Sequence, residues 1–298
     1  MRPLQATFLG IGAQKSATTW LYGVLQQSQH VRVSEEKEVD FFSYWFDRGY
    51  EWYERNFDGS EAVRHRGEIS PSYLIHPSAA SRAAAYNRDM AIFVMLRDPV
   101  ERAYSNHLHE ARKGHISGAN LSFEQALENN PLYREQGRYA AYLKAWYDAF
   151  PAEQIHVMFQ EDINADRARA AAYVMSALGV PTLDNFLDLR ANESVRYRNA
   201  AMGETLWKVG NYARRNGLGR VVEAVKAAPG VKHMREANRE AMRDLIHPMA
   251  PETAADLTEY FADDVAQLEK MLGRRVPWTR FSQDTHTKPE TVGAALTA

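Results

Sequence analysis

The sequence contains no cysteine, and that absence removes several kinds of chemistry at once. A chain without thiols has no disulfide framework, no thiolate zinc site and no cysteine nucleophile. Long apolar runs are missing too, because Gly10, Gly12, Gln14 and Lys15 interrupt the first one. No signal core is visible, and no window approaches the roughly 20 apolar residues that span a bilayer. We therefore expect a cytoplasmic protein without a transmembrane segment.

The chain also has no excess of charge of either sign. Lys and Arg number 36, Asp and Glu number 38, and the formal net charge of the 298 residues is −2. This balance gives no reason to expect a nucleic-acid partner, and no nucleic-acid-binding motif is present. The histidines show no metal-ligand spacing, since His107 and His109 would face different sides of a helix. We therefore expect no metal site.

The remaining composition is that of a globular protein in which strands and helices alternate. Apolar residues make up 45% and charged residues 25%, which excludes a wholly disordered chain, a collagen and a coiled-coil rod. Short apolar runs predict buried strands at residues 6–12, 91–96 and 155–159. Helical patterns follow these runs at residues 16–27, 99–113 and from 160 to about 178. Strands that alternate with helices predict an α/β fold with a parallel sheet.

The C-terminal third has a different pattern. From about residue 203 onward the sequence is mostly helical, and the strongest apolar stripe covers residues 252–272. Residues 281–298 are small and polar, which predicts a flexible tail. No linker divides the chain, so we expect one domain over residues 1–280 with a helical C-terminal lobe.

The segment GIGAQKSATT, residues 10–19, joins the first strand to the first helix. A helix start presents free N–H groups and a positive dipole end, which suit a phosphate. Further donors would come from Lys15, Ser16, Thr18 and Thr19. A nucleotide-kinase loop requires two glycines where this chain has Leu9 and Gln14. Taken alone, the segment is explained equally well as a helix start that serine and threonine cap.

The segment RDPVERAYS, residues 97–105, joins the second predicted strand to its helix. Ligands of open α/β sheets bind at the carboxyl ends of strands, where Arg97 would offer a forked donor to a phosphate. Ser105 lies two turns further on and would reach the same anion only if the ligand lay along the helix. The alternative is a solvated helix start in which Asp98 and Glu101 complement the helix dipole.

Together, GAQKSATTWL and RDPVERAYS resemble the paired signature of sulfotransferases that use 3′-phosphoadenosine 5′-phosphosulfate (PAPS), in particular the heparan-sulfate-type branch and its bacterial relatives. The resemblance covers roughly residues 5–178 and the final helix. It implies a P-loop-like three-layer α/β sandwich with a central parallel sheet. It also implies that the first loop holds the 5′-phosphosulfate and the second the 3′-phosphate. The matching positions are Lys15, Ser16, Ala17, Thr18 and Thr19 in the first loop, and Arg97 and Ser105 in the second. Ala17 stands where the family usually has glycine.

An acidic run before two aromatic residues, EEKEVDFF at 35–42, has two interpretations. Charged runs are usually solvated turns. This one, however, resembles the family element whose glutamate is the catalytic base, and Glu38 matches that glutamate. Asp40 stands where some heparan enzymes have histidine. The segment 67–74 resembles a further family element, but Ile69 replaces the lysine that contacts sulfated sugar, which weakens the case for a polyanionic acceptor.

The resemblance implies a sulfotransferase that moves a sulfuryl group from PAPS to a hydroxyl or amine of a small-molecule, glycan or lipid acceptor. Glu38 would take the acceptor proton, Lys15 would stabilise the leaving group, and adenosine 3′,5′-bisphosphate (PAP) would be released without any need for a metal. Candidates for closing over the nucleotide are Arg196, Arg198 and Arg243.

Two other functions remain open on the sequence. The first is a P-loop kinase with a degenerate phosphate loop, in which Asp162 would bind the metal; otherwise we expect Glu161 and Asp162 to cap the helix that follows them. The second is a nucleotide-binding module without catalytic activity.

Overall fold

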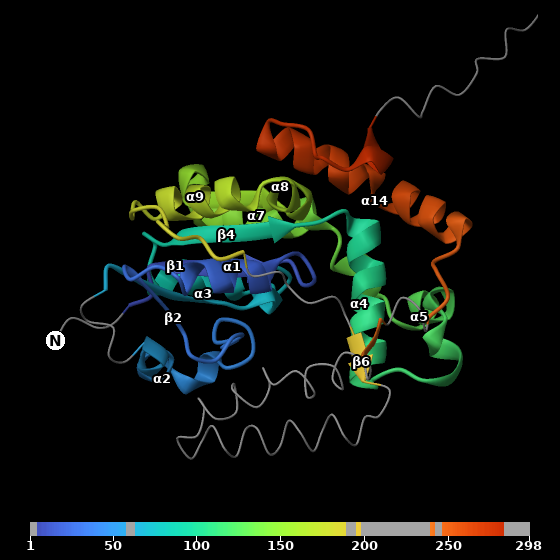
Figure 1. Ribbon diagram of the computed structural model, residues 1–298, viewed down its shortest axis with the longest axis horizontal. Coiled ribbons are helices and arrows are strands. Elements are labelled where there is room, and N and C mark those ends of the chain that lie inside the picture. Colours follow the sequence, from blue (N-terminus) through green and yellow to red (C-terminus); the bar gives the residue numbers. More distant parts are fainter. Residues whose placement is uncertain (1–4, 58–62, 189–194, 198–238, 242–245, 283–298) are drawn as a thin grey trace, which may run out of the picture.

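The computed structural model describes residues 5–57, 63–188, 195–197, 239–241 and 246–282. Its centre is a five-stranded parallel sheet with strand order β2-β3-β1-β4-β5 (Figure 1). The strands are β1 (Phe8–Gly12), β2 (Val31–Val33), β3 (His65–Ile69), β4 (Ala91–Leu96) and β5 (Ile155–Phe159). A separate antiparallel pair is formed by β6 (Val195–Tyr197) and β7 (Arg239–Ala241).

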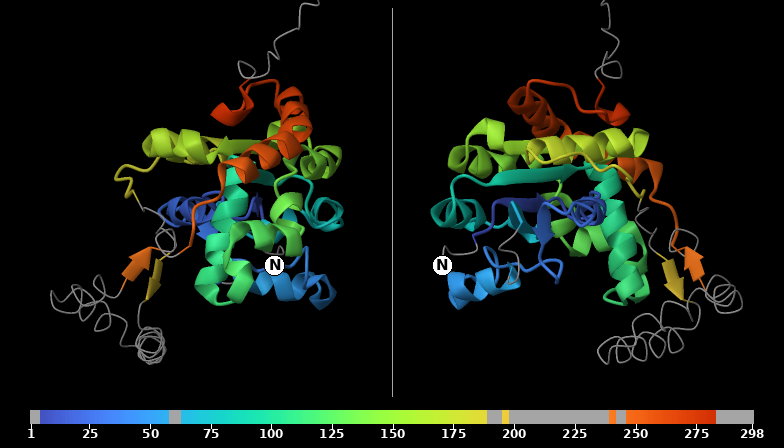
Figure 2. Two further views of the ribbon diagram at one scale, coloured as in Figure 1. Left: turned by 90° about the vertical axis from the view of Figure 1, so that its right-hand side faces the viewer. Right: turned by 60° about the vertical axis from the view of Figure 1, so that its left-hand side comes forward.

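Both faces of the sheet are buried, which explains why its central strands are continuous apolar runs. Alternate residues of one strand enter different hydrophobic clusters: in β4, Ile92 and Val94 join one cluster, whereas Phe93 and Met95 join the other. Helices cover each face, as Figures 1 and 2 show. The arrangement is a three-layer α/β sandwich, as the resemblance implies.

The helices divide between the two faces. One cluster contains residues of α1 (Thr18–Leu25), α8 (Gln160–Ala165) and α9 (Arg167–Ala177). The other contains residues of α3 (Ala79–Tyr86), α4 (Pro99–Lys113), α5 (Phe123–Asn129), α6 (Leu132–Glu135), α7 (Tyr139–Ala149) and α14 (Pro251–Leu272). Tyr53 of the short α2 (Tyr50–Glu54) also belongs to this second cluster.

The sequence correctly predicts β1, β4, β5, α1, α4 and α14, but it misses β2 and β3. The helix expected from 160 to 178 is two helices, because Asp166 has a non-helical backbone and its side chain caps α9 by accepting a hydrogen bond from Arg169 N. The capping role expected of Glu161 and Asp162 is wrong, since no side chain caps α8. Glu161 instead accepts hydrogen bonds from Asp98 N and Trp278 Nε1, both at 3.1 Å.

Other expectations fall on residues that the structure does not describe. They include Arg198, Arg243, the helical pattern between 203 and 238, and residues 283–298 of the expected tail. Arg196 lies in β6, but its side chain is not described. The single domain over 1–280 stays a prediction. Within the described ranges, none of the helices has the length and apolar character needed to cross a membrane.

The described part of the C-terminal lobe packs on the sheet domain, and a buried carboxylate takes part in this contact. Leu257, Phe261 and Leu268 of α14 belong to the same hydrophobic cluster as α4 and α7. Asp264 of α14 accepts hydrogen bonds from the N–H groups of Ala140 and Ala141, at 3.0 and 3.1 Å. These N–H groups lie in the first turn of α7, where the helix itself supplies no acceptor. Asp264 therefore caps a helix from outside it.

We expect Asp264→Ala to lower the free energy of unfolding by about 2 kcal/mol, because two buried N–H groups lose a charged acceptor. Urea denaturation measures this change. Asp263→Ala is the matched control, since Asp263 is exposed and should leave stability nearly unchanged. Equal effects of the two substitutions would contradict the capping role.

Candidate active site

The loop between β1 and α1 has a left-handed backbone at two non-glycine residues. Lys15 has φ 69° and Ala17 has φ 60°. Ala17 is the N-cap of α1, and no side chain caps this helix. The alternative in which serine or threonine caps the helix is therefore wrong. The first turn of α1 keeps free N–H donors at the carboxyl edge of the sheet, where a ligand can reach them.

Lys15 is a half-buried cation in a strongly positive environment. It forms no ion pair within the described residues, and the pKa of its amine is lowered to about 8. Burial is the largest cause, followed by the positive charges of Arg112, Arg97, Lys37 and Lys113. An amine that is both desolvated and surrounded by cations is best stabilised by an added anion.

The next residue, Ser16, has a fully buried side chain. Its hydroxyl lies near the Tyr139 hydroxyl, which donates to the Arg97 carbonyl oxygen at 2.9 Å. Within the described residues the Ser16 Oγ has no hydrogen bond of normal geometry. An unsatisfied buried hydroxyl beside Lys15 fits a loop that is completed by a phosphate-bearing ligand.

The second predicted loop lies beside the first. Arg97 follows β4 directly, its charge acts on Lys15, and its side chain contacts Glu101 at 3.5 Å. Asp98 caps α4 by accepting hydrogen bonds from Val100 N and Glu101 N. It is buried, so this helix start is not the solvated one of the alternative interpretation, although the Asp98 carboxylate does lie at the positive end of the helix. Ser105 is half-buried in α4 and has no hydrogen-bond partner among the described residues. The structure thus brings Arg97 and Lys15 together. Ser105 could contact the same ligand only if that ligand lay along α4.

Glu38 belongs to the same site because Lys37 connects it to the phosphate loop. The Lys37 amine donates to Thr19 Oγ1 at 3.2 Å and contacts Glu38 Oε1 at 3.1 Å. The Glu38 side chain is 49% exposed, so its carboxylate is accessible to a second ligand. Thr18 is buried, and Thr19 is exposed beside Lys37. The structure therefore places a carboxylate next to a loop with the features of a phosphate site.

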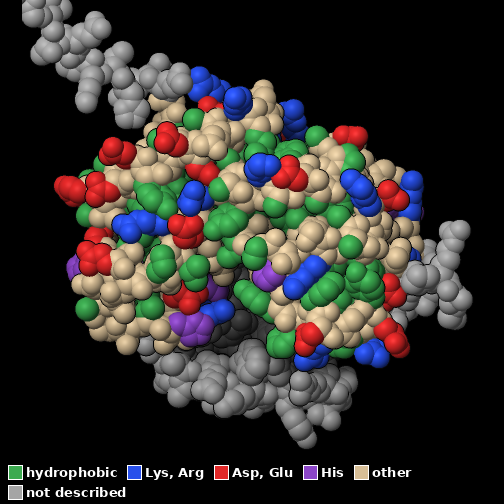
Figure 3. All heavy atoms as spheres, turned by 180° about the vertical axis from the view of Figure 1, so that it is seen from behind, with side chains coloured by type: hydrophobic (Ala, Val, Ile, Leu, Met, Phe, Trp, Pro, Cys, Tyr) green, Lys and Arg blue, Asp and Glu red, His purple; other side chains and the backbone are tan. Residues whose placement is uncertain are grey.

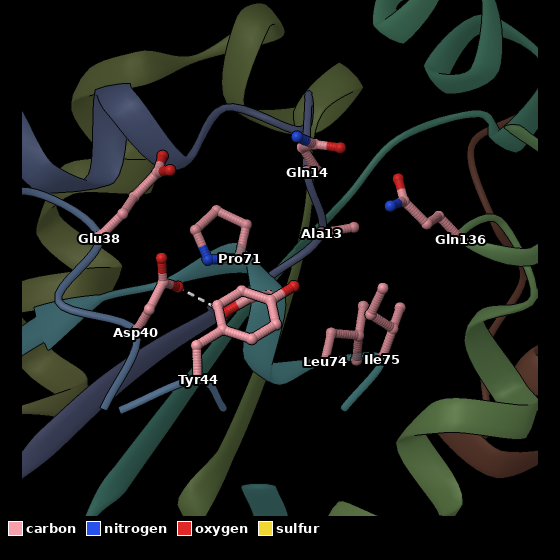
Figure 4. Close-up of a pocket in the computed structure, with 10 residues that line it drawn as sticks. Ala13, Gln14, Glu38, Asp40, Tyr44, Pro71, Leu74, Ile75 and Gln136 are labelled. Atoms are coloured by element: carbon pink, nitrogen blue, oxygen red, sulfur yellow. Dashed lines mark hydrogen bonds between the residues drawn. The ribbon is translucent and has the colours of Figure 1, made fainter. Parts of the chain in front are cut away.

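Glu38 also lines a pocket with a volume of about 160 Å³. Figure 4 shows Glu38 and Gln136 on opposite sides, with Ala13 and Gln14 between them. The other lining residues are Asp40, Tyr44, Pro71, Ser72, Leu74 and Ile75. This volume is close to that of a protein cavity that binds benzene, which is about 150 Å³. On the face of the molecule seen in Figure 3, a hollow is bordered by histidine and basic side chains.

Several site residues were not identified from the sequence. Lys37 is one, and His109, Arg112 and Lys113 at the end of α4 are others. The positive charge of Lys15 acts on His109, and burial followed by this charge lowers the His109 pKa to about 3. The spacing of 105, 109 and 112 places these residues on one helix face, which is a signal that the sequence contains.

Asp162, the metal ligand of the kinase alternative, lies elsewhere. It lines a separate pocket at the edge strand β5, together with Tyr147, Arg169 and Arg274. The charges that act on Lys15 do not include it. Within the described residues no cluster of His, Asp and Glu side chains could hold a metal ion. The described residues therefore give the kinase alternative no support.

Comparisons with known proteins agree with this geometry. The family model described as "Sulfotransferase domain" matches residues 6–269. The human protein named heparan sulfate glucosamine 3-O-sulfotransferase 3B1 is 28% identical over 180 residues, which cover 57% of this chain and 45% of that protein. The Dictyostelium discoideum protein named membrane-associated sulfotransferase kil1 is 32% identical over 103 residues, which cover 34% and 22%. The chain thus spans less than half the length of these curated relatives.

A solved structure resembles nearly the whole chain. The crystal structure of a sulfotransferase from Alicyclobacillus acidocaldarius superposes with a TM-score of 0.66 at 25% sequence identity. The match covers 91% of this chain and 97% of that one.

The left-handed Ala17 leads to a stability prediction. We expect Ala17→Gly to raise the free energy of unfolding by about 1 kcal/mol, because glycine adopts a positive φ without steric cost. The same exchange at Ala84, inside α3, should lower it by about 1 kcal/mol. Chemical denaturation measures both, and a destabilising effect at Ala17 would contradict the strained loop.

Proposed function

This chain belongs to the sulfotransferase domain family, and we propose that it transfers the sulfuryl group of PAPS to an acceptor hydroxyl or amine. The observation that carries the proposal is Lys15, a half-buried cation without an ion-pair partner among the described residues. It lies at an uncapped helix start with four more cations near it. Such a site fits a ligand with several negative charges better than any neutral molecule.

The two loops divide the donor between them in this proposal. Lys15, Ser16, Ala17, Thr18 and Thr19 hold the 5′-phosphosulfate through N–H groups, hydroxyls and the amine. The buried Ser16 hydroxyl supports this assignment, because it makes no hydrogen bond of normal geometry within the described residues. Arg97 and Ser105 hold the 3′-phosphate, and the half-buried Ser105 hydroxyl is available for that contact.

The proposed chemistry is a single in-line transfer. The acceptor oxygen or nitrogen forms a bond to sulfur while the bond between sulfur and the bridging phosphate oxygen breaks. Glu38 takes the acceptor proton as general base. Lys15 stabilises the negative charge that develops on the bridging oxygen, and PAP leaves. Lys37, between Thr19 and Glu38, holds the base next to the donor loop. No metal is required by this scheme.

The acceptor is proposed to be a neutral small molecule, glycan or lipid. The pocket beside Glu38 includes two carboxylates, Glu38 and Asp40, and no lysine or arginine among the described residues that line it. Two carboxylates repel a polyanion. Tyr44 and Ile75 offer apolar surface to the rest of the acceptor. The buried Ile69, in place of a sugar-binding lysine, supports the same choice.

Donor selectivity tests the function directly. We expect calorimetry to show tight binding of PAP and much weaker binding of ADP with magnesium, because only PAP carries the 3′-phosphate assigned to Arg97. Arg97→Ala should weaken PAP binding by about 10- to 100-fold. Arg88→Ala, at an exposed arginine, is the control. Preference for ADP with magnesium would contradict the sulfotransferase proposal.

The lowered pKa of Lys15 predicts the pH dependence of donor binding. An anion favours the protonated amine, so PAP affinity should be highest near pH 7, where the phosphates are ionised, and fall as the pH rises through about 8. The fall approaches about tenfold per pH unit in the alkaline range. Lys15→Arg keeps its charge and should remove the dependence. A wild-type affinity that is flat to pH 9.5 would rule out Lys15 as the cation that binds the anion.

A further inference from the structure

The loop that carries Glu38 is attached to a single buried carboxylate, that of Glu68. The Val39 N–H lies close enough to this carboxylate to favour its ionised form, and two further N–H groups of the loop connect to it through hydroxyls. The Asp40 N–H donates to Ser70 Oγ at 2.9 Å, and that hydroxyl donates to Glu68 Oε2 at 2.6 Å. The Phe42 N–H donates to the Tyr73 hydroxyl at 3.3 Å, which in turn donates to Glu68 Oε1.

The two hydroxyls share one arrangement. Each accepts from a loop N–H and has its own hydrogen left to donate to Glu68. Two hydroxyl donors and the nearby Val39 N–H favour the carboxylate form of Glu68. Glu68 is fully buried at the end of β3, so no water replaces any of these partners at its surface.

The loop needs such an anchor because its backbone is strained. Glu38 has φ 66° and Asp40 has φ 56°, and neither is glycine. Residues in the left-handed region persist only where the surroundings hold them there. The Glu38 side chain has one polar contact among the described residues, to the partly exposed Lys37. Its direction toward the pocket therefore depends on its backbone together with this contact.

We propose that Glu68 is a positioning residue, which holds residues 38–42 in the conformation that aims the Glu38 carboxylate into the acceptor pocket. This role rests on the proposed function, because positioning has a purpose only if Glu38 is the base. Glu68 does not touch the pocket itself, and its effect passes through Val39, Ser70 and Tyr73. The neighbouring Asp40–Ser72 hydrogen bond, at 2.5 Å, involves a side chain of the loop and no backbone N–H.

The titratable groups that face Glu68 are Asp40, Tyr53 and Tyr73. Burial is the main cause that raises the pKa of Glu68 to about 7, and the Asp40 charge adds to it, whereas the hydrogen bonds oppose it. The carboxylate is therefore present above about pH 7 and is lost below it. An amide at position 68 should differ most from the native residue in the alkaline range.

Amide hydrogen exchange measured by NMR on the free full-length protein tests this role. At pH 8, Glu68→Gln should make the Val39, Asp40 and Phe42 amides exchange about 10- to 100-fold faster. The difference from wild type should shrink at pH 6, where both side chains are neutral. Ser70→Ala should accelerate mainly Asp40, and Tyr73→Phe mainly Phe42. Ser81→Ala, which removes an exposed hydroxyl that bonds only the Ser78 carbonyl oxygen among the described residues, should change none of the three.

Unchanged exchange of the three amides in a folded Glu68→Gln protein would overturn the proposal. If Glu68→Gln does not fold, the exchange of individual amides in Ser70→Ala and Tyr73→Phe provides the test. Equal acceleration of all three amides in both variants would overturn the proposal. PAP affinity is measured on the same samples and should change less than about twofold. If the wild-type protein does not bind PAP, the proposed function is wrong. The exchange data would then still show whether Glu68 holds the loop of residues 38–42.

Discussion

The site depends on one electrostatic constraint, which is an excess of positive charge around the half-buried Lys15 at the carboxyl edge of the sheet. Lys15 is desolvated, surrounded by Arg97, Arg112, Lys37 and Lys113, and forms no ion pair within the described residues. Its left-handed backbone, and that of Ala17, place the amine and the first N–H groups of α1 in one loop. In the free protein, the repulsion between these cations and the desolvation of Lys15 are unfavourable. Binding of an anionic donor would offset both.

A single segment, residues 68–74, contacts both that loop and the loop of Glu38, the proposed base. On one side Ser70 N and Leu74 N donate to the carbonyl oxygens of Gly10 and Ile11, both at 2.9 Å, which holds the end of β1. On the other side the Ser70 and Tyr73 hydroxyls hold the loop of Glu38. Both loops are thus attached to the same short segment, and the Lys37–Thr19 hydrogen bond joins them directly as well. In the proposed function, this segment would help to align the donor and the acceptor.

Local patterns in the sequence predict the parts of this structure that have a local cause. Apolar runs indicate β1, β4 and β5, and Gly114 ends α4 as its left-handed conformation requires. The strand β3 was missed because His65 and Arg66 interrupt its apolar pattern. Lys37 and Glu68 were missed because their partners lie far away in the sequence, at Thr19 and in the 39–42 loop. Nothing in the sequence around Ala17 predicts its positive φ. The one indication is that the family which the chain resembles usually has glycine at this position.

The most direct test of the account is to separate binding from turnover at Glu38. The measurement is transfer of radiolabelled sulfate from PAPS to a panel of neutral alcohols, phenols and amines, made on wild type and Glu38→Gln beside PAP calorimetry. The account predicts that the substitution lowers turnover by about 100-fold or more and leaves PAP affinity within about twofold. Undiminished turnover in Glu38→Gln, or turnover and PAP binding lost together, would contradict it.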